Sequence, residues 1–135
     1  MLQQTQVSRV VERYARFLEQ FPTVGDCAGA PVGDVIDEWS GLGYNRRAVH
    51  LHRVATMCVE RFDGTLPDSL DELLSLPGIG PYTARAVLVF AHERDIGLVD
   101  TNAGRFVSRA LTGRRLRPAE AQAVADAAVP PTPIR

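Results

Sequence analysis

Two glycines and two prolines lie within six consecutive residues near the middle of the chain, and they limit its fold more than any other feature. The stretch LPGIGP, residues 76–81, separates two apolar segments with helical spacing. Proline cannot continue a helix but suits the first turn of one, and glycine adopts backbone angles that other residues avoid. The sequence therefore predicts two short helices joined by a tight hairpin over residues 69–92. We expect Leu73, Leu74 and Ile79 to lie inside, with Ile79 as the anchor of the hairpin.

Most of the remaining chain repeats apolar residues at the spacing of amphipathic helices. The predicted helices run from near residue 3 to 20, from 31 to about 39, from about 45 to 62 and from 118 to about 128, with a short helix that Thr23 caps. No segment alternates apolar and polar residues as a half-buried strand does. We therefore expect an all-α fold, a helical bundle with short loops around the hairpin.

One further helix is expected after residue 100. Either Thr101 or Asn102 could cap its start, because both side chains carry an oxygen that can accept from the first-turn amides. The apolar residues that follow recur at helical spacing, so Phe106, Val107 and Leu111 are expected to be buried.

The composition is that of a globular protein, with 45% hydrophobic and 23% charged residues. We assign residues 1–129 to one domain and residues 130–135 to a proline-rich tail. No apolar run approaches the roughly 20 residues of a membrane-spanning helix, and the start lacks a basic-then-apolar signal segment, so we expect no membrane partner and a cytoplasmic location, at the nucleoid in a bacterium. Cys27 and Cys58 lack metal-ligand spacing, which predicts two small buried apolar groups and no metal site.

The net charge of −1 does not indicate a nucleic-acid partner, but the basic residues are unevenly distributed. One stretch without acids holds Arg105, Arg109, Arg114, Arg115 and Arg117, and a second basic stretch holds Arg46, Arg47, His50, His52 and Arg53. Such clusters can bind phosphate, although a solvated helix face balanced by acids elsewhere would have the same composition. All 15 residues counted as lysine plus arginine are arginine.

The hairpin carries a chemical expectation of its own. Gly78, Ile79 and Gly80 leave the backbone uncovered, and the N–H groups at the start of the next helix point outward together, which favours an anion such as phosphate. With Tyr82 and Thr83, this stretch resembles the helix-hairpin-helix motif of DNA-binding proteins. The resemblance implies a grip on one backbone phosphate, often with a monovalent cation held by loop carbonyls. A plain glycine-rich connector between two helices is the alternative.

Asp100 lies downstream of the hairpin, directly before a predicted helix. Two apolar residues precede it, so we expect partial burial, and an aspartate in this position is most often a helix cap. The hairpin together with a downstream aspartate resembles the HhH-GPD superfamily of base-excision DNA glycosylases. The resemblance implies that the Asp100 carboxylate is catalytic, because it would stabilise the positive charge on the sugar of a flipped nucleotide when the base leaves. Tyr82 and Asn102 would line the base pocket.

Three more motifs narrow the resemblance to one branch of that superfamily. MLQQTQV at residues 1–7, FPT at 21–23 and GLGY at 41–44 are similar to the MutY-type adenine glycosylases. The resemblance runs from residue 1 to about 113. It implies hydrolysis of the N-glycosidic bond of adenine paired with G or 8-oxoguanine, in double-stranded DNA that holds a mispaired or damaged base, by a monomer.

This branch implies DNA contacts by Gln3, Gln4, Thr5, Tyr44, Arg46 and Arg47. Gln4 and Tyr44 would wedge into the base stack beside the lesion, and Thr5 would touch the base opposite the adenine. Arg46 and Arg47 would meet the flanking phosphates. Ordinary first-turn residues at the start of a helix, and a surface tyrosine after a glycine turn, are the structural alternatives for these positions.

Tyr82 stands where bifunctional relatives that resemble endonuclease III carry a lysine, which forms a Schiff base with the sugar. The chain contains no lysine at all. Lyase chemistry by a lysine is therefore excluded, and the resemblance implies a monofunctional glycosylase. A pyrimidine-lesion glycosylase related to endonuclease III is the alternative that Tyr82 disfavours.

The resemblance also implies groups that the sequence does not hold. The catalytic glutamate of the family lies just upstream of the MLQQ run, and the ligands of its iron-sulfur cluster lie after the helical core. We therefore expect no cofactor in this chain, and we expect the chain as given to bind DNA weakly and to excise adenine poorly. A non-catalytic helix-hairpin-helix module that only binds DNA is a further alternative.

Overall fold

The computed structural model describes residues 1–130, and over these residues its regular elements are helices without a strand. The all-α expectation is therefore confirmed for the described part of the chain. The chain divides into two compact units, one made of Met1–Pro67 with Ser75–Gly78, and the other of Asp68–Leu74 with the residues from Ile79 onward. Of the tail predicted at residues 130–135, all but the first residue lies outside the described residues.

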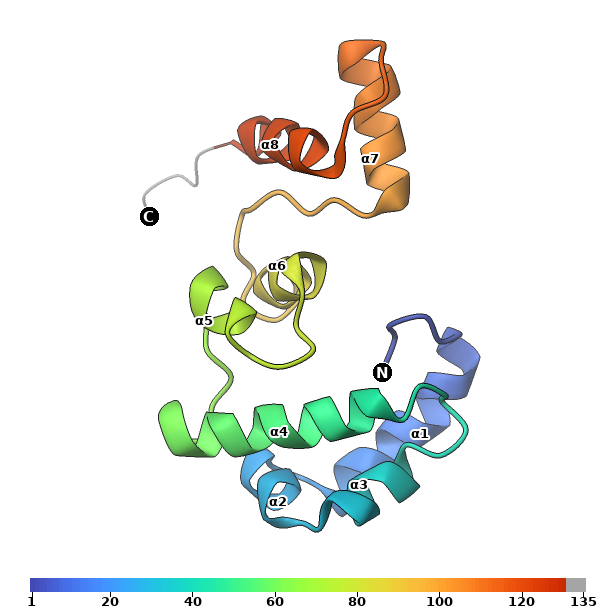
Figure 1. Cartoon of the computed structure of the whole chain (residues 1–135), viewed down its shortest axis with the longest axis vertical. Helices are drawn as coiled ribbons and strands as arrows, with labels where there is room; N and C mark the ends of the chain where they lie inside the picture. The colour runs from blue at the N-terminus through green and yellow to red at the C-terminus, as the bar shows by residue number, and fades with distance from the viewer. Residues whose placement is uncertain (131–135) are drawn as a thin grey trace. The chain divides into compact units, whose positions relative to one another are not determined.

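The first unit is built from four helices (Figure 1). They are α1 (Val7–Gln20), α2 (Val24–Gly29), α3 (Val32–Glu38) and α4 (Arg46–Arg61). Thr23 caps α2 as predicted, because its hydroxyl accepts from the amide of Asp26 while the Asp26 carboxylate accepts from the amide of Thr23. The sequence predictions for α2, α3 and α4 agree with the structure to within a few residues.

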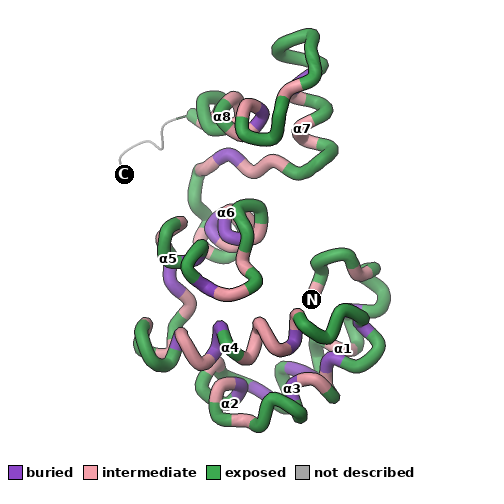
Figure 2. Tube along the Cα trace, in the orientation of Figure 1, coloured by how far each residue is buried: buried purple, intermediate pink, exposed green. Residues whose placement is uncertain are grey.

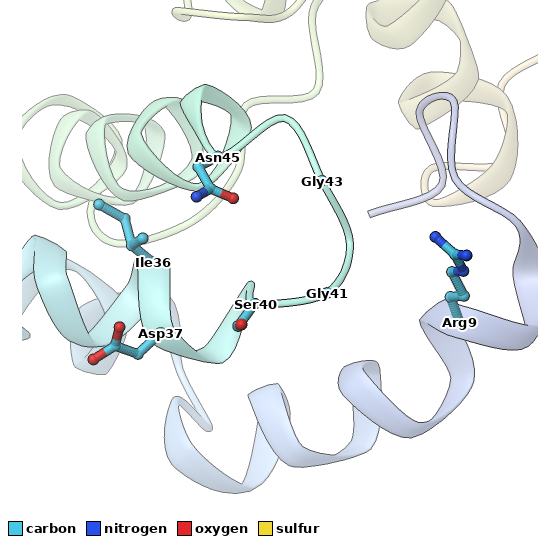
Figure 3. Close-up of a pocket in the computed structure, with 7 residues that line it drawn as sticks. All are labelled: Arg9, Ile36, Asp37, Ser40, Gly41, Gly43 and Asn45. Carbon is cyan, nitrogen blue, oxygen red and sulfur yellow. The ribbon is translucent and has the colours of Figure 1, made fainter.

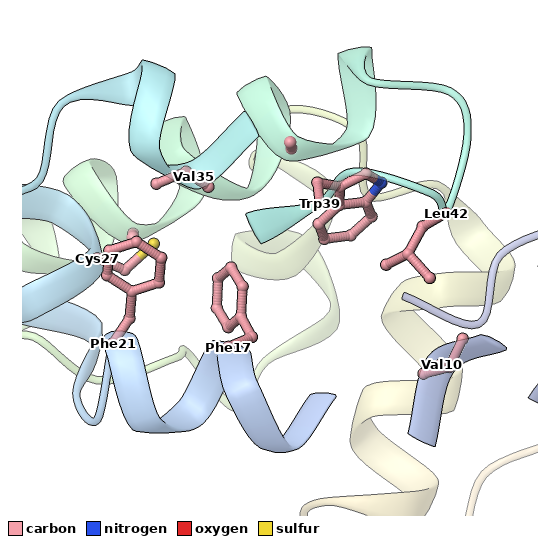
Figure 4. Close-up of a cluster of buried hydrophobic side chains, with 9 residues drawn as sticks. Val10, Phe17, Phe21, Cys27, Val35, Trp39 and Leu42 are labelled. Atoms are coloured by element: carbon pink, nitrogen blue, oxygen red, sulfur yellow. The ribbon is translucent and has the colours of Figure 1, made fainter. Parts of the chain in front are cut away.

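A buried apolar cluster joins these helices (Figure 4). Its members are Val10, Phe17, Phe21, Cys27, Val35, Trp39, Leu42, Ala48 and Ala55. The rings of Phe17 and Phe21 lie 4.9 Å apart, centroid to centroid, in a tilted arrangement. Each large side chain buried here contributes about 1.5–3 kcal/mol relative to its exposed state, so the cluster stabilises the first unit.

Helix α1 begins at Val7, and the prediction that it starts near Gln3 was wrong. Residues 3 and 4 form a turn, and Gln4 has a left-handed backbone with φ 54°. A residue in that conformation cannot belong to a right-handed helix. The segment before Gln6 is therefore a loop, although its composition is compatible with a helix.

The second unit contains α5 (Leu70–Leu74), α6 (Pro81–Phe90), α7 (Thr101–Val107), a single π-helical turn η1 (Ser108–Thr112) and α8 (Pro118–Ala128). Ser69 and Glu72 are joined at the start of α5, because the hydroxyl of Ser69 accepts from the amide of Glu72 at 3.3 Å and donates to the Glu72 carboxylate at 2.6 Å. Leu73 is fully buried, whereas Leu74 is 40% exposed, so only one of these two leucines has the predicted position.

The predicted core residues after Asp100 are largely on the surface (Figure 2). Phe106 is 70% exposed and Leu111 is 60% exposed, and Val107 is half-buried, so this part of the core prediction was wrong. In this unit α7 packs on α8, and a Cβ added at Gly104 would lie 3.9 Å from Cβ of the buried Ala121 and 3.5 Å from Val99. None of the helices over residues 1–130 combines the length and apolar character that a membrane crossing requires.

Candidate nucleic-acid interface

The turn of the hairpin depends on glycine at one position for two separate reasons. Gly78 has φ +77°, which other residues rarely adopt, and a Cβ added there would lie 2.5 Å from Nδ1 of His50. Leu76 is buried at 2% exposure and anchors the turn, whereas Ile79 is only half-buried. The prediction that Ile79 is the anchor was therefore wrong, because the turn directs Leu76 rather than Ile79 inward.

Helix α6 follows the turn and begins without a side-chain cap. Gly80 is its N-cap in an extended conformation, and Pro81 occupies its first turn. Tyr82 is 50% exposed, and Thr83 is half-buried beside it. Because the N-cap is a glycine, no N-cap side chain accepts from the first amides of α6. N–H groups at a helix start and the helix dipole both favour negative charge, so this position is suited to an anion.

Two loops of the first unit lie close together, and each exposes one side chain at a left-handed residue. Gln4 has φ 54° and Tyr44 has φ 52°; Gln4 is exposed, and Tyr44 is 67% exposed. The hydroxyl of Thr5 donates to the carbonyl oxygen of Leu42 at 3.1 Å, which joins the N-terminal loop to the loop before α4. The two side chains for which the resemblance implies a wedge therefore project from joined loops.

Arg46 and Arg47 begin α4 but point to different surroundings. Arg46 is exposed. The Nη1 and Nη2 atoms of Arg47 donate to the carbonyl oxygens of Met1, Gln3, Leu42 and Gly43 and to the hydroxyl of Thr5. Its guanidinium also lies over the rings of Trp39, at 5.2 Å, and Tyr44, at 5.7 Å. The prediction that Arg47 contacts a phosphate differs from this arrangement. The four N–H bonds of Nη1 and Nη2 are already used by five oxygen acceptors of the protein itself.

Asp100 is the N-cap of α7. Its Oδ1 accepts from the amide of Ala103 at 2.7 Å, and the residue is exposed. The expectation of partial burial was wrong, as was the expectation that Thr101 or Asn102 caps this helix. The backbone of Asp100 is extended, whereas Thr101 already has helical geometry, so Asp100 is the residue whose carboxylate reaches the first-turn amides.

The other predicted pocket residues lie in the first turns of their helices. Asn102 is exposed on α7, and Tyr82 is half exposed on α6. Both belong to the same unit as Asp100.

Sequence reasoning missed an ion pair that positions the segment before Asp100. Arg85 on α6 donates to both carboxylate oxygens of Asp126 on α8, at 2.6 and 3.1 Å, and to the carbonyl oxygen of Gly97 at 2.9 Å. The amide of Gly97 donates back to Asp126 at 3.1 Å. Arg85 and Asp126 are 41 residues apart, so no local pattern in the sequence could indicate this contact.

The basic stretch after α7 is partly balanced by one acid. Arg114 donates to Glu120 at 3.0 Å, and Arg117 donates to the same carboxylate through its side chain at 3.2 Å and through its backbone amide at 2.8 Å. The hydrogen bond from Arg114, followed by those from Arg117, lowers the pKa of Glu120 from its ordinary value to about 2. Arg105 and Arg109 remain exposed on the surface of the second unit.

A polar surface pocket of about 410 Å³ lies beside the loop before α4 (Figure 3). Its lining consists of Arg9, Ile36, Asp37, Ser40, Gly41, Gly43 and Asn45. None of the predicted site residues lines it, but its lining residues Gly43 and Asn45 directly flank Tyr44 in the chain.

The cysteines have the buried positions that the sequence predicted. Cys27 is 5% exposed and Cys58 is 1% exposed, both are free thiols, and burial raises the pKa of each thiol. No group of three metal-ligating side chains was found among the described residues. An iron-sulfur cluster of the usual type requires four cysteines, so the two cysteines of this chain do not fit one.

The sequence as a whole is similar to a known repair family. Residues 1–131 match the profile of the HhH-GPD superfamily base excision DNA repair protein family. An adenine DNA glycosylase of Mycolicibacterium smegmatis is 45% identical over 119 residues, which are 88% of this chain and 41% of that protein. An adenine DNA glycosylase of Mycobacterium tuberculosis is 41% identical over 133 residues, and the human one is 39% identical over 110 residues. The chain spans about two fifths of the length of the mycobacterial relatives.

Solved structures show the same fold at lower identity. A thermostable thymine-DNA glycosylase matches 96% of this chain with a TM-score of 0.85 at 25% identity, and the match covers 62% of that protein. Endonuclease III in a trapped covalent intermediate with DNA matches 95% of this chain with a TM-score of 0.82 at 25% identity, and the match covers 61% of that protein.

Proposed function

Because the chain belongs to the HhH-GPD superfamily of base excision DNA repair proteins, we propose that it forms the helix-hairpin-helix part of a glycosylase that removes adenine paired with G or 8-oxoguanine. The observation that carries the proposal is the level of identity. The chain is 41–45% identical to mycobacterial adenine DNA glycosylases, but only 25% identical to the thymine-DNA glycosylase and endonuclease III that share its fold.

In this proposal the hairpin holds one phosphate of double-stranded DNA. The uncovered turn at Gly78 and the uncapped start of α6 at Gly80 supply backbone N–H groups, and a monovalent cation could be bound by the turn carbonyls. Arg46 adds an exposed positive charge. Contacts of this kind fix where the duplex lies but do not read its sequence.

Gln4 and Tyr44 then fill the space that the extruded adenine leaves. Extrusion costs a few kcal/mol in lost stacking, and side chains inserted between the bases offset part of it. The two residues support this role because both are exposed at the tips of joined loops. Tyr82 and Asn102 would contact the extruded base, and Gln3, Thr5 and Thr83 would contact the surrounding DNA.

Asp100 would stabilise the sugar as the glycosidic bond breaks. The transition state carries positive charge on the deoxyribose, and a fixed carboxylate nearby lowers its energy. The bond from the Ala103 amide to one carboxylate oxygen restricts the rotation of the side chain. Since the chain has no lysine, the product is an abasic site and the strand is not cleaved by a lysine Schiff base. We expect the protein to act as a monomer in the cytoplasm, at the nucleoid in a bacterium.

A chimera provides the test. The 119 residues of this chain that match the adenine DNA glycosylase of Mycolicibacterium smegmatis would replace their counterparts in that protein. We expect the chimera to release adenine from an A:8-oxoguanine duplex and no base from a thymine-glycol duplex. Release from thymine glycol alone would support the endonuclease III-like alternative. Duplex binding that is equal for both lesions, with no release, would support a module that only binds DNA.

A further inference from the structure

Arg47 contacts the backbone at matching positions in the two loops that expose Gln4 and Tyr44. Its Nη1 donates to the carbonyl oxygen of Gln3, directly before Gln4. Its Nη2 donates to the carbonyl oxygen of Gly43, directly before Tyr44, at 3.1 Å. Gln4 and Tyr44 are two of the four non-glycine residues with positive φ among the described residues. One guanidinium therefore binds both loops at the peptide that leads into the left-handed residue.

Such a contact is needed because left-handed backbone is unfavourable for residues with a Cβ. Each costs roughly 1–2 kcal/mol, so a free loop would seldom hold it. The planar guanidinium can bind several carbonyl oxygens at once, whereas the ammonium of a lysine is a single point with three donors. The buried ring of Trp39, at 2% exposure, lies under the guanidinium and sets its position. The guanidinium carbon also lies over the ring of Tyr44, at 5.7 Å from the ring centroid.

We propose that Arg47 is a positioning residue that couples Gln4 and Tyr44 into one rigid wedge, rather than a contact to DNA. It binds neither wedge side chain by hydrogen bonds and acts through the peptides before them. The coupling of the two loops is inferred from the hydrogen bonds of Arg47 alone. The role of the coupled loops as a wedge in DNA rests on the proposed function. Loss of Arg47 should therefore release both loops together.

The coupling can be measured in the protein without DNA, by NMR order parameters of the backbone amides. In the unaltered chain we expect values of about 0.85 at Gln4 and Tyr44, typical of rigid backbone, and in Arg47→Lys values that fall at both positions toward about 0.6. Arg61→Met serves as the control, because Arg61 is an exposed arginine of the same helix whose guanidinium lies over Phe62. Unchanged values at both positions, or a fall at only one of them, would overturn the proposal.

Arg47→Met gives a second comparison, since it removes all donors but keeps part of the apolar stem over Trp39. If Arg47→Met unfolds the first unit, Arg47→Lys still decides the question, because lysine keeps the positive charge but lacks the planar guanidinium with its several N–H donors. Full rigidity of both loops in Arg47→Lys would show that charge alone suffices, and this result would contradict the proposed coupling.

The consequence on DNA can be measured in the chimera with 2-aminopurine placed beside the A:8-oxoguanine pair, because its fluorescence rises when it loses stacking. When Gln4 and Tyr44 are present, we expect Arg47→Lys to lower that rise in fluorescence several-fold. When Gln4→Ala and Tyr44→Ala are already in place, adding Arg47→Lys should not lower the fluorescence further. An equal effect in both backgrounds would mean that Arg47 acts on DNA directly, which overturns the positioning role. If the chimera without further substitutions produces no rise, the proposed function fails, while the order parameters still decide the coupling.

Discussion

Arg85 and Asp126 form a two-point ion pair that encloses the backbone of Gly97, three residues before Asp100. The pair joins α6 to α8 within the second unit. Arg85 is 16% exposed and Asp126 is 40% exposed at the side chain, so the pair is partly shielded from water. A Cβ on Gly97 would lie 2.7 Å from the backbone nitrogen of Asp126 and 2.8 Å from the carbonyl carbon of Ala125, so only glycine fits against this part of α8.

Asp126→Ala should therefore destabilise the protein by about 1–2 kcal/mol, because Arg85 and the Gly97 amide both lose their partner. Urea unfolding would measure the change. The exposed pair of Arg94 and Asp68, at 53% and 59% exposure, offers a control, and Arg94→Ala should cost about 0–1 kcal/mol. Equal costs for the two variants would contradict a special role for the Arg85 pair.

The two glycines of the hairpin should differ sharply in their tolerance of a methyl group. Gly78→Ala should cost about 2 kcal/mol or more, because Gly78 has φ +77° and a Cβ there meets His50 at 2.5 Å. Gly80→Ala should cost under about 1 kcal/mol, because its φ is −91° and no atom lies within 4 Å of the added Cβ. Thermal unfolding of both variants would show the difference, and similar losses would contradict this description of the turn.

Two substitutions at Asp100 separate its role as a helix cap from its proposed role in catalysis. Asparagine can still accept from the Ala103 amide, so Asp100→Asn should leave stability within about 0.5 kcal/mol, while Asp100→Ala should cost about 0.5–2 kcal/mol. In the chimera, both should lose adenine release, since asparagine carries no negative charge. Release by Asp100→Asn at the unaltered rate, measured in single-turnover assays, would limit Asp100 to capping.

The acid sensitivity of the second unit should depend on Glu120. Its folded-state pKa of about 2 lies below the ordinary value of 4.5, so its contribution to stability is fully present above about pH 5 and is lost as the pH falls toward 2. Melting temperatures of the unaltered chain and of Glu120→Gln, recorded between pH 6 and 2 at low salt, should therefore converge at the acid end. A constant difference across that range would mean that the bonds from Arg114 and Arg117 do not favour the charged form.

The absence of lysine gives a chemical prediction. Reduction with borohydride traps a Schiff base between an amine and an opened abasic sugar. Because no lysine is present, no side chain of the unaltered chain should form a covalent complex with abasic DNA. If Tyr82 lies beside the sugar, the variant Tyr82→Lys should form such a complex. Gel electrophoresis under denaturing conditions would detect the complex. Failure of Tyr82→Lys to react would place Tyr82 away from the sugar.

Local features were predictable because nearby residues decide them. The capping of α2 by Thr23, the end of α5 in the hairpin, and the start of α8 at Pro118 follow from residue types within one or two turns of each other. The motifs that indicate the repair family are of the same kind, since each is a short contiguous run. The chain alone was therefore enough to predict the fold class and the proposed hairpin contact.

Contacts between distant segments decided the rest. The sequence places Arg47 in a basic cluster and so predicts that it binds phosphate. In the structure its guanidinium donates instead to five oxygens of the N-terminal loop and the loop before α4. Phe106 has the spacing of a core residue, yet it is 70% exposed although α7 packs on α8. A pattern along the chain shows which residues can share a helix face, and only packing in three dimensions determines which face is covered and which charge meets a partner.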